Sequence, residues 1–232
     1  MAPIDTWFTI GTVGMTLGTL VLVYGLRLMP RAKWRQYSIL IAVPGIAVVA
    51  YALMALGVGA VETATGSVAY LPRYVDWLLT TPLHILYLGL FAGAARGIIG
   101  RAVALQTATI LFGLVGALVA SPLKWLLYVA GLCSFAGVVY YTYGDFGEAA
   151  DRLGGSTAAL YRKLRAFLVV LWLVYPLIWL VGPNSLSLMD VETTALVVTY
   201  IDIVSKVGLG LIALNGQVAF AGVDETTGAP GD

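Results

Sequence analysis

Residues 199–210 read TYIDIVSKVGLG, and they place an acid, Asp202, and a base, Lys206, inside an otherwise apolar run. A charged side chain at the centre of a bilayer costs about 3 kcal/mol or more, so such residues face the interior of a bundle and pair with one another. Asp202 and Lys206 are four residues apart, which puts both on one face of a helix. The stretch therefore predicts a membrane-embedded helix whose charged face is turned inward.

The composition of the whole chain also predicts a membrane protein. Of its 232 residues, 60% are hydrophobic and 11% are charged, a balance that would leave a soluble domain with much exposed apolar surface. Seven apolar runs can each reach the roughly 20 residues that a helix needs to cross a hydrocarbon core. These runs are residues 4–26, 38–61, 71–92, 98–119, 123–143, 160–181 and 188–218. We predict an all-α membrane protein with one seven-helix bundle over residues 1–220 and a disordered, polar and acidic tail at 221–232.

The basic residues of the loops predict the orientation of this bundle. The loops after the first, third and fifth runs, with the start of the sixth, hold Arg27, Arg31, Lys33, Arg35, Arg96, Arg101, Arg152, Arg162, Lys163 and Arg165. The opposite loops hold Lys124 alone. Because cytoplasmic loops collect Lys and Arg, we expect a multi-pass protein of the cell membrane with an extracellular N-terminus and a cytoplasmic C-terminus. A net charge of +1 predicts no nucleic-acid partner.

A second charged pair, Arg73 and Asp76, lies in the third run at a spacing of three residues. With Asp202 and Lys206 it would form a neutral, buried cluster of two cations and two anions. One interpretation is a salt-bridge network that only joins helices, since buried charge can also specify packing.

Aromatic residues accompany this cluster and favour a chemical role. Trp77 follows Asp76, and Trp172, Tyr175 and Trp179 recur at helical spacing in the sixth run. Aromatic stripes alone are typical of a core or of a membrane interface. A buried lysine amine, however, can condense with an aldehyde to form a Schiff base, and flat rings can clamp a conjugated chain. The two acids would then serve as counterions.

Three stretches resemble motifs of the microbial (type 1, haloarchaeal) rhodopsins: RYVDWLLTTPL at 73–83, WLVYPLIW at 172–179 and DIVSKVG at 202–208. They occur in the order and on the helices (third, sixth and seventh) that the family uses. The resemblance implies a photoreceptor and not an enzyme, with all-trans retinal bound covalently to Lys206 as a Schiff base. The resemblance also allows other retinal isomers, and it implies no metal site.

The resemblance also implies roles for individual residues. Asp76 would be the primary counterion and proton acceptor, Asp202 the second counterion, and Arg73 would arrange charge and water below them. Tyr51 and Tyr74 would brace Asp202 and the Schiff-base region. The implied retinal pocket is lined by Trp77, Thr81, His84, Thr109, Tyr128, Gly131, Leu132, Phe135, Trp172, Tyr175 and Trp179.

A few positions separate a sensor from a pump. The acid Asp76 argues against a chloride pump, which resembles this pattern but has a neutral residue there. Tyr87 stands eleven residues after Asp76, where an outward proton pump has a carboxylic acid, and Tyr is a poor proton donor at neutral pH. The two extracellular release glutamates of such a pump become Asn184 and Thr194, although Glu192 lies near them.

Other residues resemble those of sensory rhodopsin II or of the related middle rhodopsin. Tyr175 and Ser205 resemble a Tyr/Thr pair that couples retinal isomerisation to the protein, and Tyr200 matches a position that touches a two-helix membrane transducer. Phe167 replaces the histidine of sensory rhodopsin I. The resemblance therefore implies that light isomerises retinal on Lys206, a proton moves toward Asp76, and helices six and seven signal phototaxis to the transducer. The alternative is a light-driven outward proton pump.

Three positions keep two interpretations each. His84 replaces an aliphatic residue of the family; it is either a neutral, hydrogen-bonded core histidine or a group that tunes retinal colour or isomer content or responds to pH or anions. Gly131 either makes room for the retinal ring or lets two helices approach closely. Gln106 either bonds to Thr81 or faces the surface.

Overall fold

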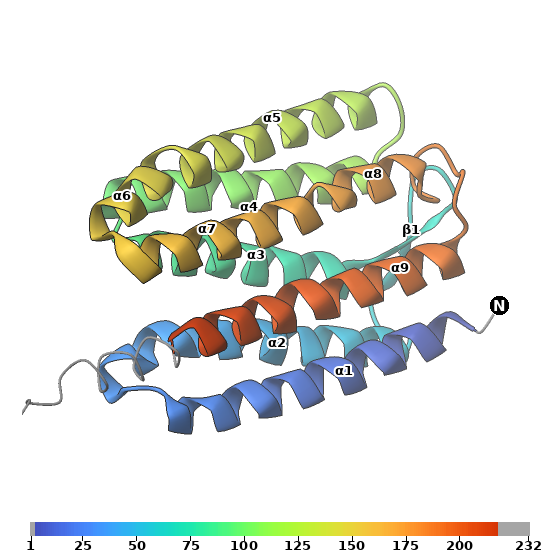
Figure 1. Cartoon of the computed structure of the whole chain (residues 1–232). Helices are drawn as coiled ribbons and strands as arrows, with labels where there is room; N and C mark the ends of the chain where they lie inside the picture. The colour runs from blue at the N-terminus through green and yellow to red at the C-terminus, as the bar shows by residue number, and fades with distance from the viewer. Residues whose placement is uncertain (1–2, 218–232) are drawn as a thin grey trace, which may run out of the picture.

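The computed structural model describes residues 3–217, and most of them lie in long helices. The first five are α1 (Ile4–Gly25), α2 (Trp34–Ala55), α3 (Leu71–Ala92), α4 (Arg96–Leu118) and α5 (Leu123–Tyr143). They are followed by α6 (Asp145–Leu153), α7 (Gly155–Trp172), α8 (Val174–Val181) and α9 (Val191–Ile203). Figure 1 shows the helices side by side with roughly parallel axes, in one bundle.

These elements form seven long helical rods. Three of the rods are interrupted, and each of these three therefore comprises more than one element. α6 continues α5 after Gly144, and α8 continues α7 after Leu173. α9 runs into a π-helical turn, Val204–Gly208, and then continues as α-helix to residue 217. The predicted seven-helix, all-α bundle is confirmed.

The break between α7 and α8 has a cause in the sequence. Pro176 has no backbone N–H, so it cannot bond to the carbonyl of Trp172 four residues earlier. The helix is interrupted at Leu173 and resumes at Val174. The interruption falls within the aromatic stretch that the sequence singled out.

Six helical stretches of the described residues are long and apolar enough to span a membrane. They are Ile4–Leu28, Arg31–Ala55, Arg96–Leu118, Leu123–Leu153, Gly155–Val181 and Val191–Gln217. The remaining rod, α3, buries 12 of its 22 residues, among them Asp76 and His84. In contrast, α4 buries 5 of 23. Because α3 faces protein more than α4 does, it tolerates more polar side chains.

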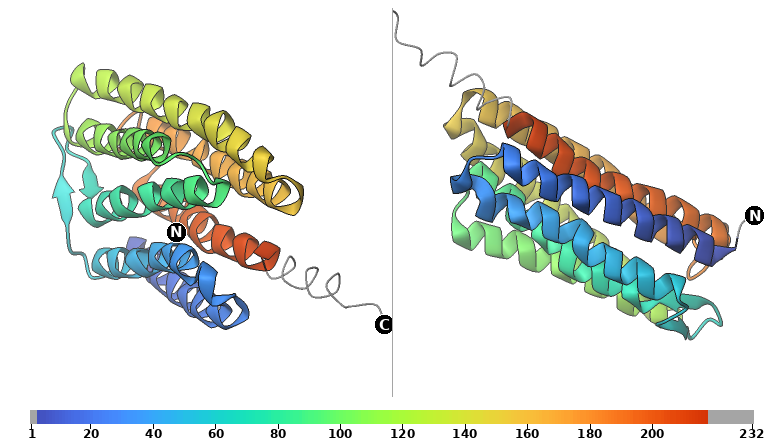
Figure 2. Two further views of the ribbon diagram at one scale, coloured as in Figure 1. Left: turned by 90° about the vertical axis from the view of Figure 1, so that its left-hand side faces the viewer. Right: turned by 90° about the horizontal axis from the view of Figure 1, so that it is seen from below.

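A short antiparallel hairpin, β1 (Ala60–Glu62) with β2 (Val68–Tyr70), joins α2 to α3. It lies at the same end of the bundle as the start of α1 and the connection from α8 to α9, which we call the hairpin end (Figures 1 and 2). The hairpin corrects the second predicted run, which extended as helix to residue 61. Gly57 and Gly59 have φ values of 71° and 79°, a conformation that ends the helix.

Other boundaries also differ from the prediction. The fifth rod continues through α6, and the sixth begins at Gly155, five residues earlier than predicted. The seventh begins at Val191, because the Asp190 carboxylate accepts a bond from the Thr193 N–H and caps the helix. The predicted tail at 221–232 lies outside the described residues, and the orientation of the termini across the membrane stays a prediction.

Candidate functional site

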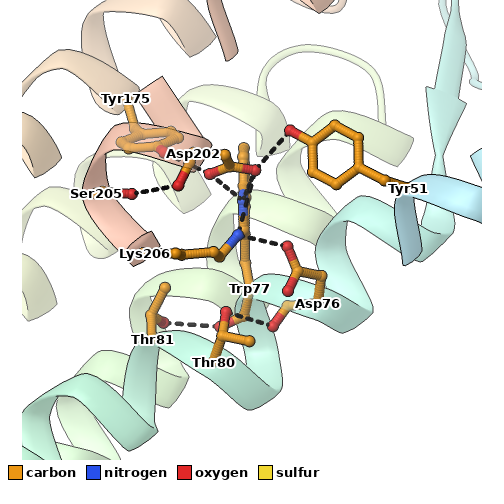
Figure 3. Close-up of polar contacts among 9 residues, drawn as sticks. All are labelled: Tyr51, Asp76, Trp77, Thr80, Thr81, Tyr175, Asp202, Ser205 and Lys206. Atoms are coloured by element: carbon orange, nitrogen blue, oxygen red, sulfur yellow. Dashed lines mark hydrogen bonds and ion pairs between the residues drawn. The ribbon is translucent and has the colours of Figure 1, made fainter. Parts of the chain in front are cut away.

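The side chain of Lys206 lies at the centre of the bundle, between α3 and α9, and is 2% exposed. Its Nζ lies 2.6 Å from Oδ2 of Asp76 and 3.2 Å from Oδ2 of Asp202 (Figure 3). The π turn carries Lys206 and Ser205, and π turns within helices frequently occur at functional sites. One buried cation is therefore bracketed by two buried carboxylates from different helices.

Asp202 is held by three further donors. The Tyr51 hydroxyl donates to Oδ2 at 2.8 Å, and the Tyr175 hydroxyl donates to Oδ1. The indole Nε1 of Trp77 lies 3.2 Å and 3.3 Å from the two carboxylate oxygens. Because these donors come from α2, α8 and α3, they fix the orientation of Asp202 (Figure 3). Tyr74 does not join them; its ring packs edge-on against Trp77.

Asp76 is far less supported than Asp202. Its Oδ2 accepts the bond from Lys206, whereas its Oδ1 is buried and has no hydrogen-bond partner among the described residues. The hydroxyl of Thr80 donates to the backbone carbonyl of Asp76 at 2.8 Å. The two carboxylates that face Lys206 thus have different environments.

Arg73, the fourth member of the expected charged cluster, lines the same cavity as Lys206. Its guanidinium lies 5.4 Å from the centre of the Phe8 ring and 6.0 Å from that of Tyr70, at the hairpin end. Two of its nitrogens are buried, and neither has a hydrogen-bond partner in the described chain. Within residues 3–217, ion pairs join Lys206 to both acids but join Arg73 to neither. The spacing of three residues put Arg73 near the face of Asp76, but its long side chain turns toward the rings of Phe8 and Tyr70.

A cavity of about 170 Å³ adjoins Lys206. Every residue expected to line a retinal pocket lies on its wall: Trp77, Thr81, His84, Thr109, Tyr128, Gly131, Leu132, Phe135, Trp172, Tyr175 and Trp179. Ile110, Pro176 and Val198 also line it and were not expected. Pro176 belongs to the sixth-run motif, whereas Ile110 and Val198 are ordinary apolar residues of membrane helices that the sequence did not distinguish.

Aromatic contacts shape the cavity away from Lys206. The rings of Tyr128 and Trp179 stack at 4.9 Å with an angle of 13°, and the Tyr128 hydroxyl donates to the Pro176 carbonyl at 3.2 Å. A Cβ on Gly131 would lie 3.6 Å from Cβ of Phe112 and 3.7 Å from the Thr109 carbonyl, which are ordinary contacts. Close approach of α4 and α5 therefore does not require glycine at position 131.

Two polar residues of the wall, Gln106 and His84, are almost fully buried. Gln106 is 2% exposed and donates from Nε2 to Oγ1 of Thr81 at 2.9 Å, so the surface-facing interpretation is wrong. His84 is 1% exposed and contacts Trp172 edge-on at 5.8 Å. Neither ring nitrogen of His84 has a hydrogen-bond partner in the described chain. The interpretation of His84 as a core histidine that is hydrogen-bonded to protein is therefore not supported.

The positions that distinguish pumps carry no carboxylate. Tyr87 is fully buried, stacks on Phe91 and accepts a bond from Nε2 of Gln217 at 3.2 Å. Gln217 was not singled out in the sequence, although a polar residue near the end of an apolar run was a usable signal. Thr194 donates to the Asp190 carbonyl at 2.7 Å.

Asn184 has a structural role at the hairpin end. Its Oδ1 accepts a 2.6 Å bond from the Ser67 hydroxyl, and its backbone carbonyl accepts a 2.6 Å bond from Nζ of Lys124. Glu192 is exposed and is not among the residues that line the cavity. The position of Glu192 therefore does not support a role for it in releasing protons from a pump.

The expected signalling residues lie on α8 and the seventh rod. Tyr175 bonds to the carboxylate of Asp202, and the Ser205 hydroxyl donates to the Asp202 backbone carbonyl at 3.1 Å. Tyr200 is 51% exposed on α9. The seventh rod thus carries Asp202 and Lys206 of the charged centre and, two residues before Asp202, an aromatic side chain on the outer surface.

The donor set and the cavity fit an elongated, conjugated aldehyde such as retinal. The amine of Lys206 would hold the aldehyde end beside two carboxylates, and the aromatic walls would pack on an apolar chain. A site that served only to join helices through salt bridges would not need an adjoining cavity.

Known proteins match this chain over nearly its whole length. The family described as bacteriorhodopsin-like protein matches residues 2–220. Sensory rhodopsin-2 of Haloarcula vallismortis is 50% identical over 231 residues, 99% of this chain and 98% of that protein. Sensory rhodopsin-2 of Natronomonas pharaonis is 38% identical over 240 residues, 100% of both chains. The crystal structure of thermophilic rhodopsin from Rubrobacter xylanophilus has a TM-score of 0.90 at 31% identity, covering 94% of this chain and 98% of that one.

Proposed function

Because the chain belongs to the bacteriorhodopsin-like family, we propose that it is a retinal-based light sensor for phototaxis that signals to a membrane transducer. The full-length similarity to two proteins named sensory rhodopsin-2 supports the sensor class. The observation that carries the choice of sensor over pump is Tyr87. It occupies the proton-donor position of a pump, yet its hydroxyl is buried and accepts a bond from Gln217.

Lys206 would bind retinal through its side-chain nitrogen. The neutral amine would condense with the aldehyde of retinal to form a Schiff base, and its two N–H protons would leave with the aldehyde oxygen as water. Bound retinal, all-trans in the dark, supplies absorption of visible light and a light-driven change of isomer. Trp172, Tyr175 and Trp179 would hold the chain in one orientation, since all three line the cavity next to Lys206.

The two carboxylates would divide the work of handling the proton at Nζ. Asp202 accepts bonds from Tyr51, Trp77 and Tyr175, which stabilise its anionic form. Asp76 has one oxygen without a partner, so its anion is stabilised less and it takes up a proton more readily. Asp76 is therefore the proton acceptor, and Asp202 keeps its charge as the second counterion.

Slow return of the proton would give a long-lived signalling state. A phenol with a reference pKa near 10 donates poorly at neutral pH, and Tyr87 is the residue at the donor position. A pump needs a fast cycle to sustain a flux, whereas a sensor benefits from a state that lasts long enough for a partner to respond. Tyr87 thus favours signalling over transport.

The signal would leave through α8 and α9. Tyr175 on α8 and Ser205 on the seventh rod both bond to Asp202, so a change of charge at Lys206 alters contacts of both rods. Tyr200 presents an exposed aromatic face two residues before Asp202. A two-helix membrane transducer bound along α7, α8 and α9 would read the resulting movement.

Three measurements made together test this proposal. Purified protein with added retinal should show a visible band that hydroxylamine bleaches, and flash photolysis should show recovery on the order of seconds. Illuminated vesicles should show no sustained proton flux. Sustained flux that a protonophore abolishes would establish the pump instead, and the absence of a visible band would reject the retinal-binding proposal.

A further inference from the structure

His84 and Gln106, which both line the cavity, have buried polar atoms without hydrogen-bond partners among the described residues. Both nitrogens of the His84 ring and Oε1 of Gln106 are buried and have no hydrogen-bond partner in residues 3–217. Both residues line the cavity, one from α3 and the other from α4. Gln106 is bonded to Thr81, which lies three residues before His84 on the same helix face. Thr81 therefore links the two residues along the wall of the cavity.

The bonds of Thr81 determine which atom of the Gln106 amide lacks a partner. The Thr81 hydroxyl donates its proton to the backbone carbonyl of Trp77 at 2.8 Å. It can therefore only accept from Gln106, so the amide NH₂ must face Thr81. The amide oxygen then faces away from Thr81 and requires a donor. A flipped amide would place two acceptors against each other.

Retinal cannot supply the missing partners. Its chain and ring are hydrocarbon, and its one polar end would lie at Lys206. Buried polar groups in proteins nearly always find a protein or water partner. A neutral imidazole offers one donor and one acceptor, and Gln106 needs a donor. One water molecule can donate to Gln106 and bond to one of the two ring nitrogens. Internal waters typically make two to four such bonds.

We propose that His84 and Gln106 hold an internal water molecule in the wall of the retinal cavity. The water donates to Oε1 of Gln106 and bonds to one nitrogen of the His84 ring. Neither residue has a function assigned in the sensing chemistry above, and the site joins α3 to α4 beside Trp172, whose ring contacts His84. The His84 ring thereby gains a defined orientation despite its lack of protein partners.

The proposed water would extend an existing chain of contacts around the cavity. Trp77 donates to Asp202, and the carbonyl of Trp77 accepts from Thr81, which in turn accepts from Gln106. The water would continue this chain to His84 and so to the edge of Trp172. If the proposed function holds, a change at Asp202 reaches the aromatic wall through hydrogen bonds as well as through α9.

The experiment uses the fact that His84 is the one histidine of the chain. Labelling with ¹⁵N-histidine gives ring signals from this side chain alone, in the retinal-loaded protein. We expect a neutral ring, a cross peak between its N–H proton and a water that does not exchange rapidly with bulk solvent, and a shift of the ring signals in Gln106→Leu. The matched control is Thr107→Val on the next residue, whose hydroxyl bonds to its own helix at the Val103 carbonyl. It should leave the ring signals in place.

Ring signals that stay unchanged in Gln106→Leu, or a ring without a water cross peak, would overturn the proposal. If Gln106→Leu fails to fold, the water cross peak of the wild-type protein decides alone. The outcome is separate from that of the proposed function. A protein that never forms a visible band refutes retinal binding, while its ring signals still report whether His84 holds a water.

Discussion

The hydroxyl of Tyr87 on α3 accepts a 3.2 Å hydrogen bond from Nε2 of Gln217, in the last described turn of the seventh rod. Both side chains are buried, and the Tyr87 ring stacks on Phe91 at 5.9 Å. The contact joins the third and seventh rods toward the end of the bundle opposite the hairpin. A position that would hold a proton donor in a pump here holds a link between two helices.

Replacing Tyr87 with Asp should speed recovery of the dark state by about tenfold or more, because a carboxylic acid transfers protons more readily than a phenol near neutral pH. Flash photolysis of the purified variant measures the rate. The matched control is Tyr87→Phe, which removes the hydroxyl without adding a donor and should not speed recovery. Equal acceleration in both variants would attribute the effect to the loss of the Gln217 contact and contradict a donor role.

Lys206 can be tested against a second buried lysine. Lys206→Ala should abolish the visible band after retinal is added, because within residues 3–217 no other lysine lines the cavity. Lys124→Met should keep the band. It should lower stability by about 1.5–3 kcal/mol, since it removes a charged hydrogen bond to the Asn184 carbonyl. Absorption spectra and thermal bleaching measure the two effects, and a visible band in Lys206→Ala would refute attachment at this residue.

Much of the charged centre could be predicted from the sequence, because buried charges in a bilayer must pair. Asp202 and Lys206 share a helix face through their spacing of four residues, and Asp76 is the acid that the third run offers. The contacts of Lys206 with both acids follow this logic. The bond from Gln106 to Thr81 was also predicted as one of two alternatives.

The rest depends on three-dimensional contacts that spacing does not encode. Arg73 shares the approximate face of Asp76, but its long side chain reaches the Phe8 and Tyr70 rings, which are distant in sequence. The π turn around Lys206 has no residue pattern that marks it. The partner of Tyr87, Gln217, lies 130 residues away and could be found only once the helices were placed.

The start of α9 should respond to acid. The hydroxyl and backbone N–H of Thr193 both donate to the Asp190 carboxylate, and these bonds lower the pKa of Asp190 below its usual value. A carboxyl with a depressed pKa stabilises the fold above its unfolded-state pKa, and this contribution is lost as pH falls through the lower folded-state value. Hydrogen exchange at the Thr193 amide, corrected for the intrinsic rate, should therefore quicken in acid. In Asp190→Asn, which caps without titrating, this acid dependence should disappear; its persistence would assign the effect to another group.

The two carboxylates differ in their hydrogen-bond partners, so replacing each with asparagine should have different consequences. Asp76→Asn should leave the fold intact, because Asp76 has one side-chain partner, but it should remove the proton acceptor. The band should move to longer wavelength, since the positive charge at Nζ loses a nearby anion in the ground state. Asp202→Asn should instead destabilise the protein, because Tyr51, Trp77 and Tyr175 all donate to this carboxylate. Visible spectra, flash photolysis and thermal bleaching of the two variants separate these effects. Loss of the deprotonated photoproduct in Asp202→Asn but not in Asp76→Asn would reverse the assignment of acceptor and fixed counterion.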